Sequence, residues 1–301
     1  MRRNRRPTPR PLTRDPALPA PFPPTALPEL PETETIARDL DREIRGRTVR
    51  GVEVTKPDVL REVSSAELAQ RLTGAKVLRS WRRAKLIVLD LDSGDRIVVQ
   101  PRFTGALLLS RGALPADEAP YSTLRLRLDD GRDLHYRDIR RLGTVTLMSP
   151  ERWEAYSAGL GTEPLDPAFS PEHLSGILRG SRQAVKKVLM EQRLVVGIGN
   201  IYANEACWRA GVDPSRAARS LDAAEVERLH GGIVSVLRDS IAARGTSFRD
   251  YRDASGGKGD FVRSLAAYGR GGAPCLRCGA RLVETHAVDG RSTVLCAHCQ
   301  R

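Results

Sequence analysis

Two closely spaced cysteine pairs near the carboxyl end constrain the fold of this chain more than any other feature. The pairs are Cys275-x-x-Cys278 and Cys296-x-x-Cys299, with 17 residues between them. Each pair can chelate a metal ion from a tight turn, and two pairs complete a tetrahedral zinc–thiolate site. Four thiolates leave no open coordination position. The pattern therefore predicts one structural zinc ion, Zn²⁺, in a loop-rich module.

The overall charge favours a polyanionic partner. Among 301 residues, 49 lysines and arginines face 37 acids, which gives a net charge of +12. This surplus suits DNA or RNA, although a merely basic soluble protein would have the same composition. No apolar run reaches the roughly 18 residues of a membrane-spanning helix, so we expect no membrane partner. Five cysteines, four of them in the two pairs, do not describe a disulfide scaffold.

A helix is predicted from Pro31 to Gly46. Ile36, Leu40 and Ile44 recur at helical spacing. Pro31 precedes them as a favoured first residue, and Gly46 follows them as a stop signal. We expect this helix to lay its apolar stripe on a sheet.

Short alternating or apolar runs follow, bounded by turn residues such as Ser93-Gly94 and Asp130-Gly131. About seven strands at this spacing indicate a sandwich or a barrel. The runs are Val49–Val54, Val77–Trp81, Leu86–Leu91, Arg96–Gln100, Ala106–Leu109, Leu124–Leu128 and Thr144–Met148. After about residue 155 the pattern becomes helical. The helical runs are Ala184–Met190, Ile201–Ala210 and 226–241.

These patterns divide the chain into four parts. Residues 1–27 hold six arginines and eight of the 20 prolines, and without periodicity they should be disordered. The rest is predicted to be an α+β protein with an N-terminal two-layer β-sandwich that includes one helix, then a helical domain and a zinc ribbon. The expected bounds are 28–155, 156–268 and 269–301.

Two further segments carry candidate chemistry. The first is Pro28–Glu32, with the sequence PELPE. A proline at a free amino terminus is a secondary amine that can attack an electrophilic carbon, whereas an internal proline is a tertiary amide. The second is Leu194–Glu205, in which Gly197 and Gly199 permit a tight turn before a helix. Exposed amides there, together with Asn200, would form a phosphate cradle.

With the cysteine module, these segments closely resemble the formamidopyrimidine-DNA glycosylase family. In these bacterial repair enzymes, removal of the initiator Met exposes the proline. The resemblance covers residues 28–301 and implies a helix-two-turns-helix in the helical domain. It also implies a bifunctional DNA glycosylase and apurinic/apyrimidinic lyase that excises oxidised purines, formamidopyrimidine and 8-oxoguanine, from double-stranded DNA. By the same resemblance we expect a monomer in the bacterial cytoplasm, associated with the nucleoid.

Three catalytic residues follow from the resemblance. Pro28 would attack the anomeric carbon of the sugar, and Glu29 would protonate the opening ring and then shuttle protons. A terminal amine has a pKa of about 7.7–8.0, so much of it is nucleophilic near neutral pH. Lys85, which ends the segment Trp81–Lys85, would reach the phosphate and sugar of the damaged nucleotide. Asn200, Lys186 and Arg291 match family positions that contact backbone phosphates.

The residues that enter the DNA stack are implied in the same way. Arg140 would face the base orphaned by extrusion of its damaged partner, and Leu142 and Phe103 would fill the gap. The family usually has Phe at the position of Leu142 and Met at that of Phe103. These departures bear on lesion preference and not on the mode of action. A Gly-rich loop, Ala254–Asp260, matches the mobile loop over the flipped base. That loop favours this family over the related endonuclease VIII type.

The residue before Pro28 is Leu27 and not Met. Because Leu can be encoded by near-cognate initiation codons, we favour residues 1–27 as an upstream segment absent from the mature protein, over a basic tail or a transit peptide. If Leu27 stays attached, the alternative is a catalytically silent protein that binds damaged DNA. A third alternative keeps base excision but loses strand cleavage, or forms the imine poorly through Lys85.

Overall fold

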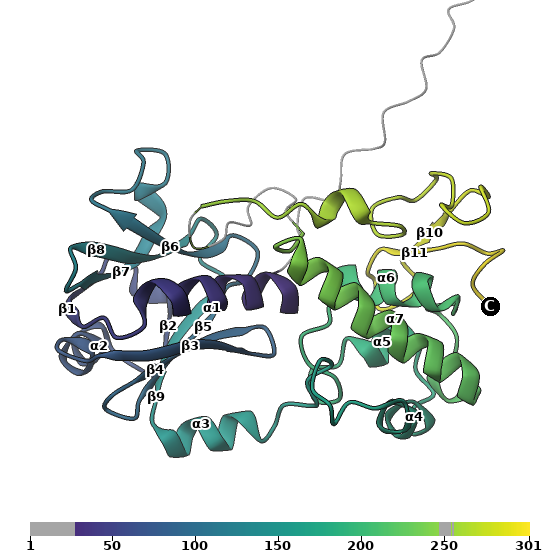
Figure 1. Ribbon diagram of the computed structural model, residues 1–301, viewed down its shortest axis with the longest axis horizontal. Coiled ribbons are helices and arrows are strands. Elements are labelled where there is room, and N and C mark those ends of the chain that lie inside the picture. The colour runs from purple at the N-terminus through teal and green to yellow at the C-terminus, as the bar shows by residue number, and fades with distance from the viewer. Residues whose placement is uncertain (1–27, 247–253, 255) are drawn as a thin grey trace, which may run out of the picture.

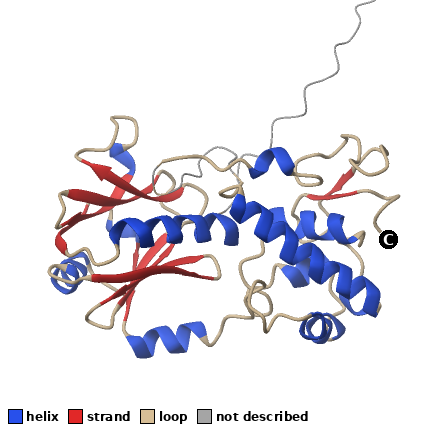
Figure 2. Cartoon of the chain, in the orientation of Figure 1, coloured by secondary structure: helices blue, strands red, loops and turns tan. Residues whose placement is uncertain are grey.

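The computed structural model describes residues 28–246, 254 and 256–301. Residues 1–27, for which the sequence predicts disorder, lie outside this range, and so does Ser255 of the predicted loop. Strands gather at one end of the molecule and most helices at the other (Figure 1, Figure 2). The predicted α+β fold class is confirmed.

Two sheets form the strand-rich end. The four-stranded sheet has the order β1-β7-β8-β6, and the five-stranded sheet has the order β2-β9-β5-β4-β3. All neighbours are antiparallel except β2 and β9. One hydrophobic core takes residues from both sheets. The bounds are β1 Val49–Val54, β2 Leu60–Arg61, β3 Val77–Arg83, β4 Leu86–Leu91, β5 Arg96–Gln100, β6 Gly105–Arg111, β7 Ser122–Leu128, β8 Arg132–Asp138 and β9 Thr144–Met148.

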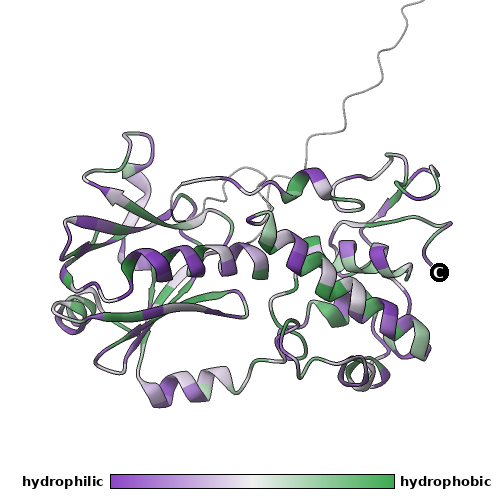
Figure 3. Cartoon of the chain, viewed as in Figure 1, coloured by the Kyte–Doolittle hydropathy of each residue, from purple (hydrophilic) through white to green (hydrophobic). Residues whose placement is uncertain are grey.

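Helix α1, Leu30–Ile44, packs along β3 and also contacts a helix of the other end, α7. Its predicted stripe of Ile36, Leu40 and Ile44 is fully buried in the core of the sheets. Figure 3 shows hydrophilic and hydrophobic residues mixed along the visible length of α1. Helix α1 thus joins the strand-rich end to the helical end. Its apolar stripe predicted the contact with a sheet, but not the contact with α7.

Strand β8 was not among the predicted strands. Its sequence contains Asp133, His135, Arg137 and Asp138, and all four side chains are buried. Because charged residues usually mark exposed positions, the run gave no strand signal. β8 is nevertheless central, since it pairs with both β6 and β7.

Helices build the second end around their own core, which includes residues of α4 to α7. A short hairpin of β10 and β11 follows near the carboxyl end. The bounds are α2 Ser65–Leu72 in the strand-rich end, then α3 Pro150–Ser157, α4 Pro171–Arg179, α5 Val185–Leu189, α6 Asn200–Ala210, α7 Ala223–Ala242, β10 Val283–Thr285 and β11 Thr293–Leu295. In the described part of the chain, no helix is long and apolar enough to cross a membrane.

The connection after α3 touches both ends of the molecule. Gly161 N–H donates to the Gln192 carbonyl at 2.9 Å, and Thr162 N–H donates to the Leu194 carbonyl at 3.1 Å. From the other side, Arg83 of β3 donates to the Gly161 carbonyl at 2.8 Å. This segment therefore fixes the end of β3 relative to the loop that leads into α6.

We predict that Gly161→Ala weakens this connection. A Cβ at Gly161 would lie 2.4 Å from the backbone carbonyl carbon of Leu194, and backbone cannot rotate away as a side chain can. The unfolding free energy should fall by about 1–3 kcal/mol. Gly176→Ala on α4 is the control, because its Cβ meets open space and Ala favours helix by up to about 1 kcal/mol. Equal midpoints for both variants in thermal unfolding would contradict this prediction.

Candidate active site and nucleic-acid interface

The first turn of α6 holds the residues that precede α1. The carboxylate of Glu29, only 2 % exposed, accepts three backbone hydrogen bonds. They come from the N–H groups of Gly199 at 2.7 Å, Ile201 at 3.0 Å and Tyr202 at 3.4 Å. The amino end of a helix offers unpaired N–H groups and partial positive charge, so it suits an anion. Pro28, which is also buried, directly precedes this anchored acid.

The amides predicted to form an exposed phosphate cradle are thus buried and bound to Glu29. Two glycines of the turn allow this contact. A Cβ on Gly199 would lie 2.4 Å from Cδ of Glu29 and 2.8 Å from Nζ of Lys85. A Cβ on Gly197, whose φ is +81°, would lie 2.7 Å from the Leu30 side chain. Only glycine lets the backbone come this close. The turn therefore brings together the predicted acid and the predicted lysine, which are 56 positions apart in the sequence.

Burial and neighbouring charges set the electrostatics of this pair. Burial raises the pKa of Glu29, while Lys85 and the three N–H groups oppose the rise. Burial lowers the pKa of the Lys85 ammonium, with Glu29 opposing the change and Arg291 adding to it. A carboxyl with a raised pKa retains its proton more readily near neutral pH, which suits a general acid.

Lys85 stands at the tip of the β3–β4 hairpin, after Ala84 at φ +54°. The carboxylate of Glu163, in the connection after α3, grips this tip. It accepts from Ala84 N–H at 2.8 Å and from the Arg83 guanidinium at 2.9 Å, and it pairs with Arg82 at 2.7 Å. Sequence reasoning missed Glu163, because nothing local to it signals a partner some 80 residues away.

Glu32 is a second residue that sequence reasoning left without a role. Its carboxylate accepts from Glu29 N–H at 3.0 Å, from the Tyr202 hydroxyl at 2.5 Å and from Thr246 N–H at 2.7 Å. Burial raises its pKa to about 7. It therefore ties the candidate acid to α6 and to the residues after α7.

Two of the predicted phosphate contacts, Asn200 and Arg291, lie near the pair of Glu29 and Lys85. Asn200 opens α6, and its Oδ1 is buried with no partner among the described residues. Arg291 lies between β10 and β11, and its side chain is 49 % exposed. The positive charge of Arg291 helps to lower the pKa of Lys85. The helical end and the hairpin therefore both bring polar groups to the site. The roles of both residues stay predictions.

Lys186, the third predicted phosphate contact, is fully buried. Its ammonium donates to the Ser292 carbonyl at 2.6 Å and to Thr293 Oγ1 at 2.7 Å. Burial lowers its pKa to about 8. The residue therefore fixes α5 to the β10–β11 hairpin, and its burial keeps it from solvent, so a direct phosphate contact would require the residues around it to move.

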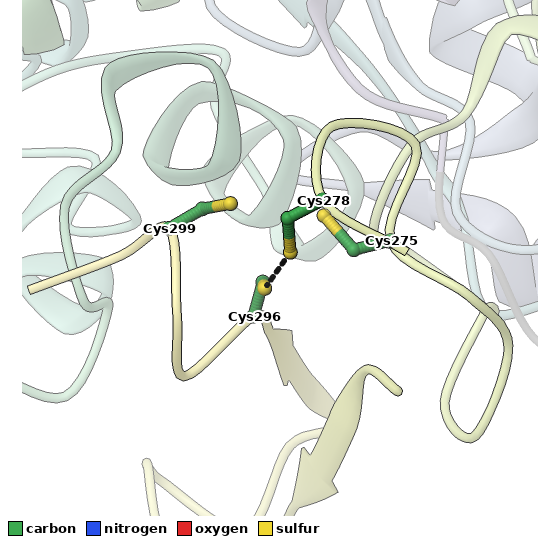
Figure 4. Close-up of side chains that lie close together, drawn as sticks. All are labelled: Cys275, Cys278, Cys296 and Cys299. Atoms are coloured by element: carbon green, nitrogen blue, oxygen red, sulfur yellow. Dashed lines mark hydrogen bonds between the residues drawn. The ribbon is translucent and has the colours of Figure 1, made fainter. Parts of the chain in front are cut away.

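The four predicted zinc ligands converge (Figure 4). Their sulfur atoms all lie within 4.8 Å of one another, and those of Cys278 and Cys296 are 3.5 Å apart. A tetrahedron with zinc–sulfur bonds of about 2.3 Å needs sulfur atoms about 3.8 Å apart. The arrangement fits one closed, structural zinc site formed with Cys275 and Cys299. The metal of this protein is one structural zinc ion.

The zinc module is joined to α6 by buried polar groups. Glu205 accepts from the N–H groups of Ala266, Ala267 and Tyr268 at 2.9, 2.8 and 2.8 Å. Asn204 accepts from Val294 N–H of β11 at 2.8 Å. The same helix that anchors Glu29 thus also positions the hairpin that carries Arg291.

The two loops predicted to enter the DNA stack lie next to each other. The guanidinium of Arg140, after β8, is 4.7 Å from the ring centre of Phe103, after β5. Leu142 is 42 % exposed, as a residue that inserts into DNA would be. Asp138 is buried and accepts from Arg140 N–H at 3.2 Å and Gly143 N–H at 2.9 Å. The loop is thus held at both ends by one carboxylate.

Three family models match the chain in order. Residues 27–145 match the formamidopyrimidine-DNA glycosylase N-terminal domain, residues 160–252 match the formamidopyrimidine-DNA glycosylase H2TH domain, and residues 272–301 match the zinc finger found in FPG and IleRS. A formamidopyrimidine-DNA glycosylase of Carboxydothermus hydrogenoformans is 40 % identical over 276 residues, which is 91 % of this chain and 100 % of the relative.

Solved structures agree with these matches. Fpg of Lactococcus lactis bound to DNA that contains an abasic site has a TM-score of 0.83 at 31 % identity, covering 91 % of this chain and 99 % of that chain. The wild-type Lactococcus lactis protein bound to DNA that contains N7-benzyl-Fapy-dG has a TM-score of 0.84 at 31 % identity, covering 91 % and 100 %. The similarity therefore extends over the whole described arrangement and not over the zinc module alone.

We predict that loss of zinc releases the hairpin that carries Arg291. Cys296→Ser should reduce the zinc content below one ion per chain and weaken binding to duplex DNA by about tenfold or more, because metal binding and folding of such modules are coupled. Metal analysis and fluorescence anisotropy with a labelled duplex would measure both. Cys207→Ala is the control, since Cys207 is buried in α6 and lies outside the metal cluster. Full zinc content in Cys296→Ser would contradict the assignment.

Proposed function

The chain belongs to the formamidopyrimidine-DNA glycosylase family, and on this basis we propose how its own residues excise a damaged base and cleave the strand. The protein is a DNA glycosylase with apurinic/apyrimidinic lyase activity, and its partner is double-stranded DNA with damaged bases. We propose formamidopyrimidine and 8-oxoguanine as its substrates, with 28–155, 156–268 and 269–301 as its working parts. We place it as a monomer in the bacterial cytoplasm, at the nucleoid.

Pro28 and Glu29 carry the chemistry in this proposal. With Pro28 as the first residue, its secondary amine attacks the anomeric carbon, and Glu29 gives its proton to the opening sugar ring. The base leaves, and the proline remains bound as an iminium ion. The iminium acidifies the neighbouring sugar proton, which permits elimination of the phosphates.

The placement of Glu29 is the observation that supports this chemistry most strongly. Glu29 directly follows Pro28 in the sequence. Three N–H groups of α6 and the turn before it fix the Glu29 carboxylate, and burial raises its pKa. An acid that is already fixed next to a nucleophile can protonate the adduct of that nucleophile without losing further conformational entropy. Nζ of Lys85 lies on the same side of Gly199 as the Glu29 carboxylate. We propose that its charge there meets the phosphate and sugar of the damaged nucleotide.

The remaining residues bind and distort the duplex. We propose that Asn200 and Arg291 contact phosphates beside Lys85, with Lys186 positioning the hairpin of Arg291. Extruding a stacked base costs a few kcal/mol, and side chains wedged into the gap recover part of it. In this proposal Arg140 faces the orphaned base, while Phe103 and Leu142 provide the apolar filling.

A catalytically silent damage-binding protein is the second candidate. In the 301-residue chain Pro28 follows Leu27, and a proline in that position is a tertiary amide without a nucleophilic lone pair. The phosphate and wedge residues would still bind DNA in that form. Base excision without strand cleavage is the intermediate case.

We predict that only a chain beginning at Pro28 forms a covalent adduct. Borohydride reduces an iminium to a stable amine, so trapping on an 8-oxoguanine duplex should give a protein–DNA band with the Pro28 form. The full-length chain should give at least about 100-fold less. If neither form gives an adduct while both still bind the lesion, the lyase mechanism is wrong. Assaying the released base then separates a glycosylase from a silent binder.

We also predict that Glu163→Gln slows the reaction by misplacing Lys85. The substitution removes the charge that faces Arg82 and Arg83, and a shift of about 1 Å can lower a rate by about a hundredfold. Single-turnover trapping should therefore fall more than duplex affinity. Glu67→Gln is the control, because Glu67 forms an exposed pair with Arg71 on α2. Equal trapping rates for Glu163→Gln and wild type would refute the positioning role.

A further inference from the structure

In the part of the chain that the structure describes, the guanidinium of Arg140 has an aromatic ring as its neighbour and no anion. It lies 4.7 Å from the ring centre of Phe103. Among the described residues, no acid or other acceptor meets this guanidinium, whereas the adjacent Arg141 pairs with Asp58 at 3.0 Å. Arg141 is thus neutralised by Asp58, whereas the guanidinium of Arg140 rests on the Phe103 ring.

The backbone of both loops fixes this pair. Thr104 Oγ1 donates to Asp138 Oδ1 at 2.5 Å, and Arg140 N–H donates to Thr104 Oγ1 at 2.9 Å. Asp138 itself is 1 % exposed. The loop of Phe103 and the loop of Arg140 are therefore joined through buried groups.

Phe103 adopts a backbone conformation that aromatic residues seldom take, with φ at +49°. Gly105 N–H closes the turn on the Arg102 carbonyl at 2.9 Å. Strained conformations of this kind persist where the surroundings determine them, and they cluster at functional sites. The turn and the anchored Thr104 together keep the ring where the guanidinium rests on it.

A guanidinium held on a ring keeps its in-plane N–H donors available. The cation–π attraction uses the face of the group, whereas hydrogen bonds to a base use its edge. Two parallel donors match two adjacent acceptors. On its pairing edge cytosine presents adjacent acceptors, O2 and N3, while adenine presents one acceptor beside a donor. A guanidinium fixed in direction therefore favours cytosine more strictly than a mobile one.

We propose that Phe103 is a positioning residue for Arg140, and that the Phe103 ring sharpens the preference of the enzyme for cytosine opposite the lesion. This inference rests on the proposed function, in which Arg140 faces the orphaned base. It adds that the ring acts through the arginine and not as apolar filling alone.

The test compares ringless and ring-bearing variants of the chain beginning at Pro28. Single-turnover excision is measured on duplexes with 8-oxoguanine opposite cytosine and opposite adenine. In Phe103→Leu and in Phe103→Met, the ratio of the two rate constants should fall by about three- to tenfold, as expected for loss of a cation–π contact. Phe103→Tyr should restore the wild-type ratio. Two ringless side chains of different shape keep the test valid if one of them folds poorly.

Arg140→Ala separates the inference from the proposed function. If Phe103 acts through Arg140, Phe103→Leu lowers the ratio in the wild type but causes no further loss in the Arg140→Ala background. A lowered ratio in Arg140→Ala with an unchanged ratio in both ringless variants overturns the inference and leaves the proposed function intact. An unchanged ratio in Arg140→Ala overturns the inference as well. Absence of excision by the wild-type chain overturns both.

Discussion

The site depends on one interaction, the hydrogen bonds between the Glu29 carboxylate and the first N–H groups of α6. An ionised carboxylate costs several kcal/mol to bury unless it is paired or hydrogen-bonded. Here the cost is offset by amides that a helix start leaves unpaired in any case. The contact joins residues that are about 170 positions apart and places Pro28 beside the glycine turn. The contacts of Glu32 with Tyr202 and Thr246 hold the beginning of α1 from the other side.

Helix α6 is the common support of the candidate site. Its first turn holds Glu29, Asn204 in its middle holds β11, and Glu205 holds the residues that lead into the zinc module. Since the zinc ion is enclosed by four thiolates, it acts by keeping this module folded. The docking of this module on α6 places Arg291 where its charge helps to lower the pKa of Lys85.

Acids that are buried, like Asp138, or half-buried, like Glu163, perform the same physical task. Glu163 accepts the N–H beside Lys85, and Asp138 accepts two N–H groups of the Arg140 loop. Each carboxylate satisfies backbone groups that have no partner in a sheet or helix, and each thereby fixes a loop. Polar contacts thus fix the loops that carry the proposed catalytic and wedge residues. Hydrophobic cores stabilise the strand-rich end and the helical end of the molecule.

The sequence alone determined the elements and the metal site that residue spacing along the chain indicates. Cysteine spacing predicted the zinc site, and apolar periodicity predicted α1 and most strands. β8 escaped because its buried positions, such as His135 and Arg137, are polar. Only the tertiary structure decided the roles of Glu163 and Glu205 and the burial of Lys186. Each of them binds at least one backbone group far away in the chain. Every residue except proline offers the same N–H and carbonyl, so no residue type signals such a contact.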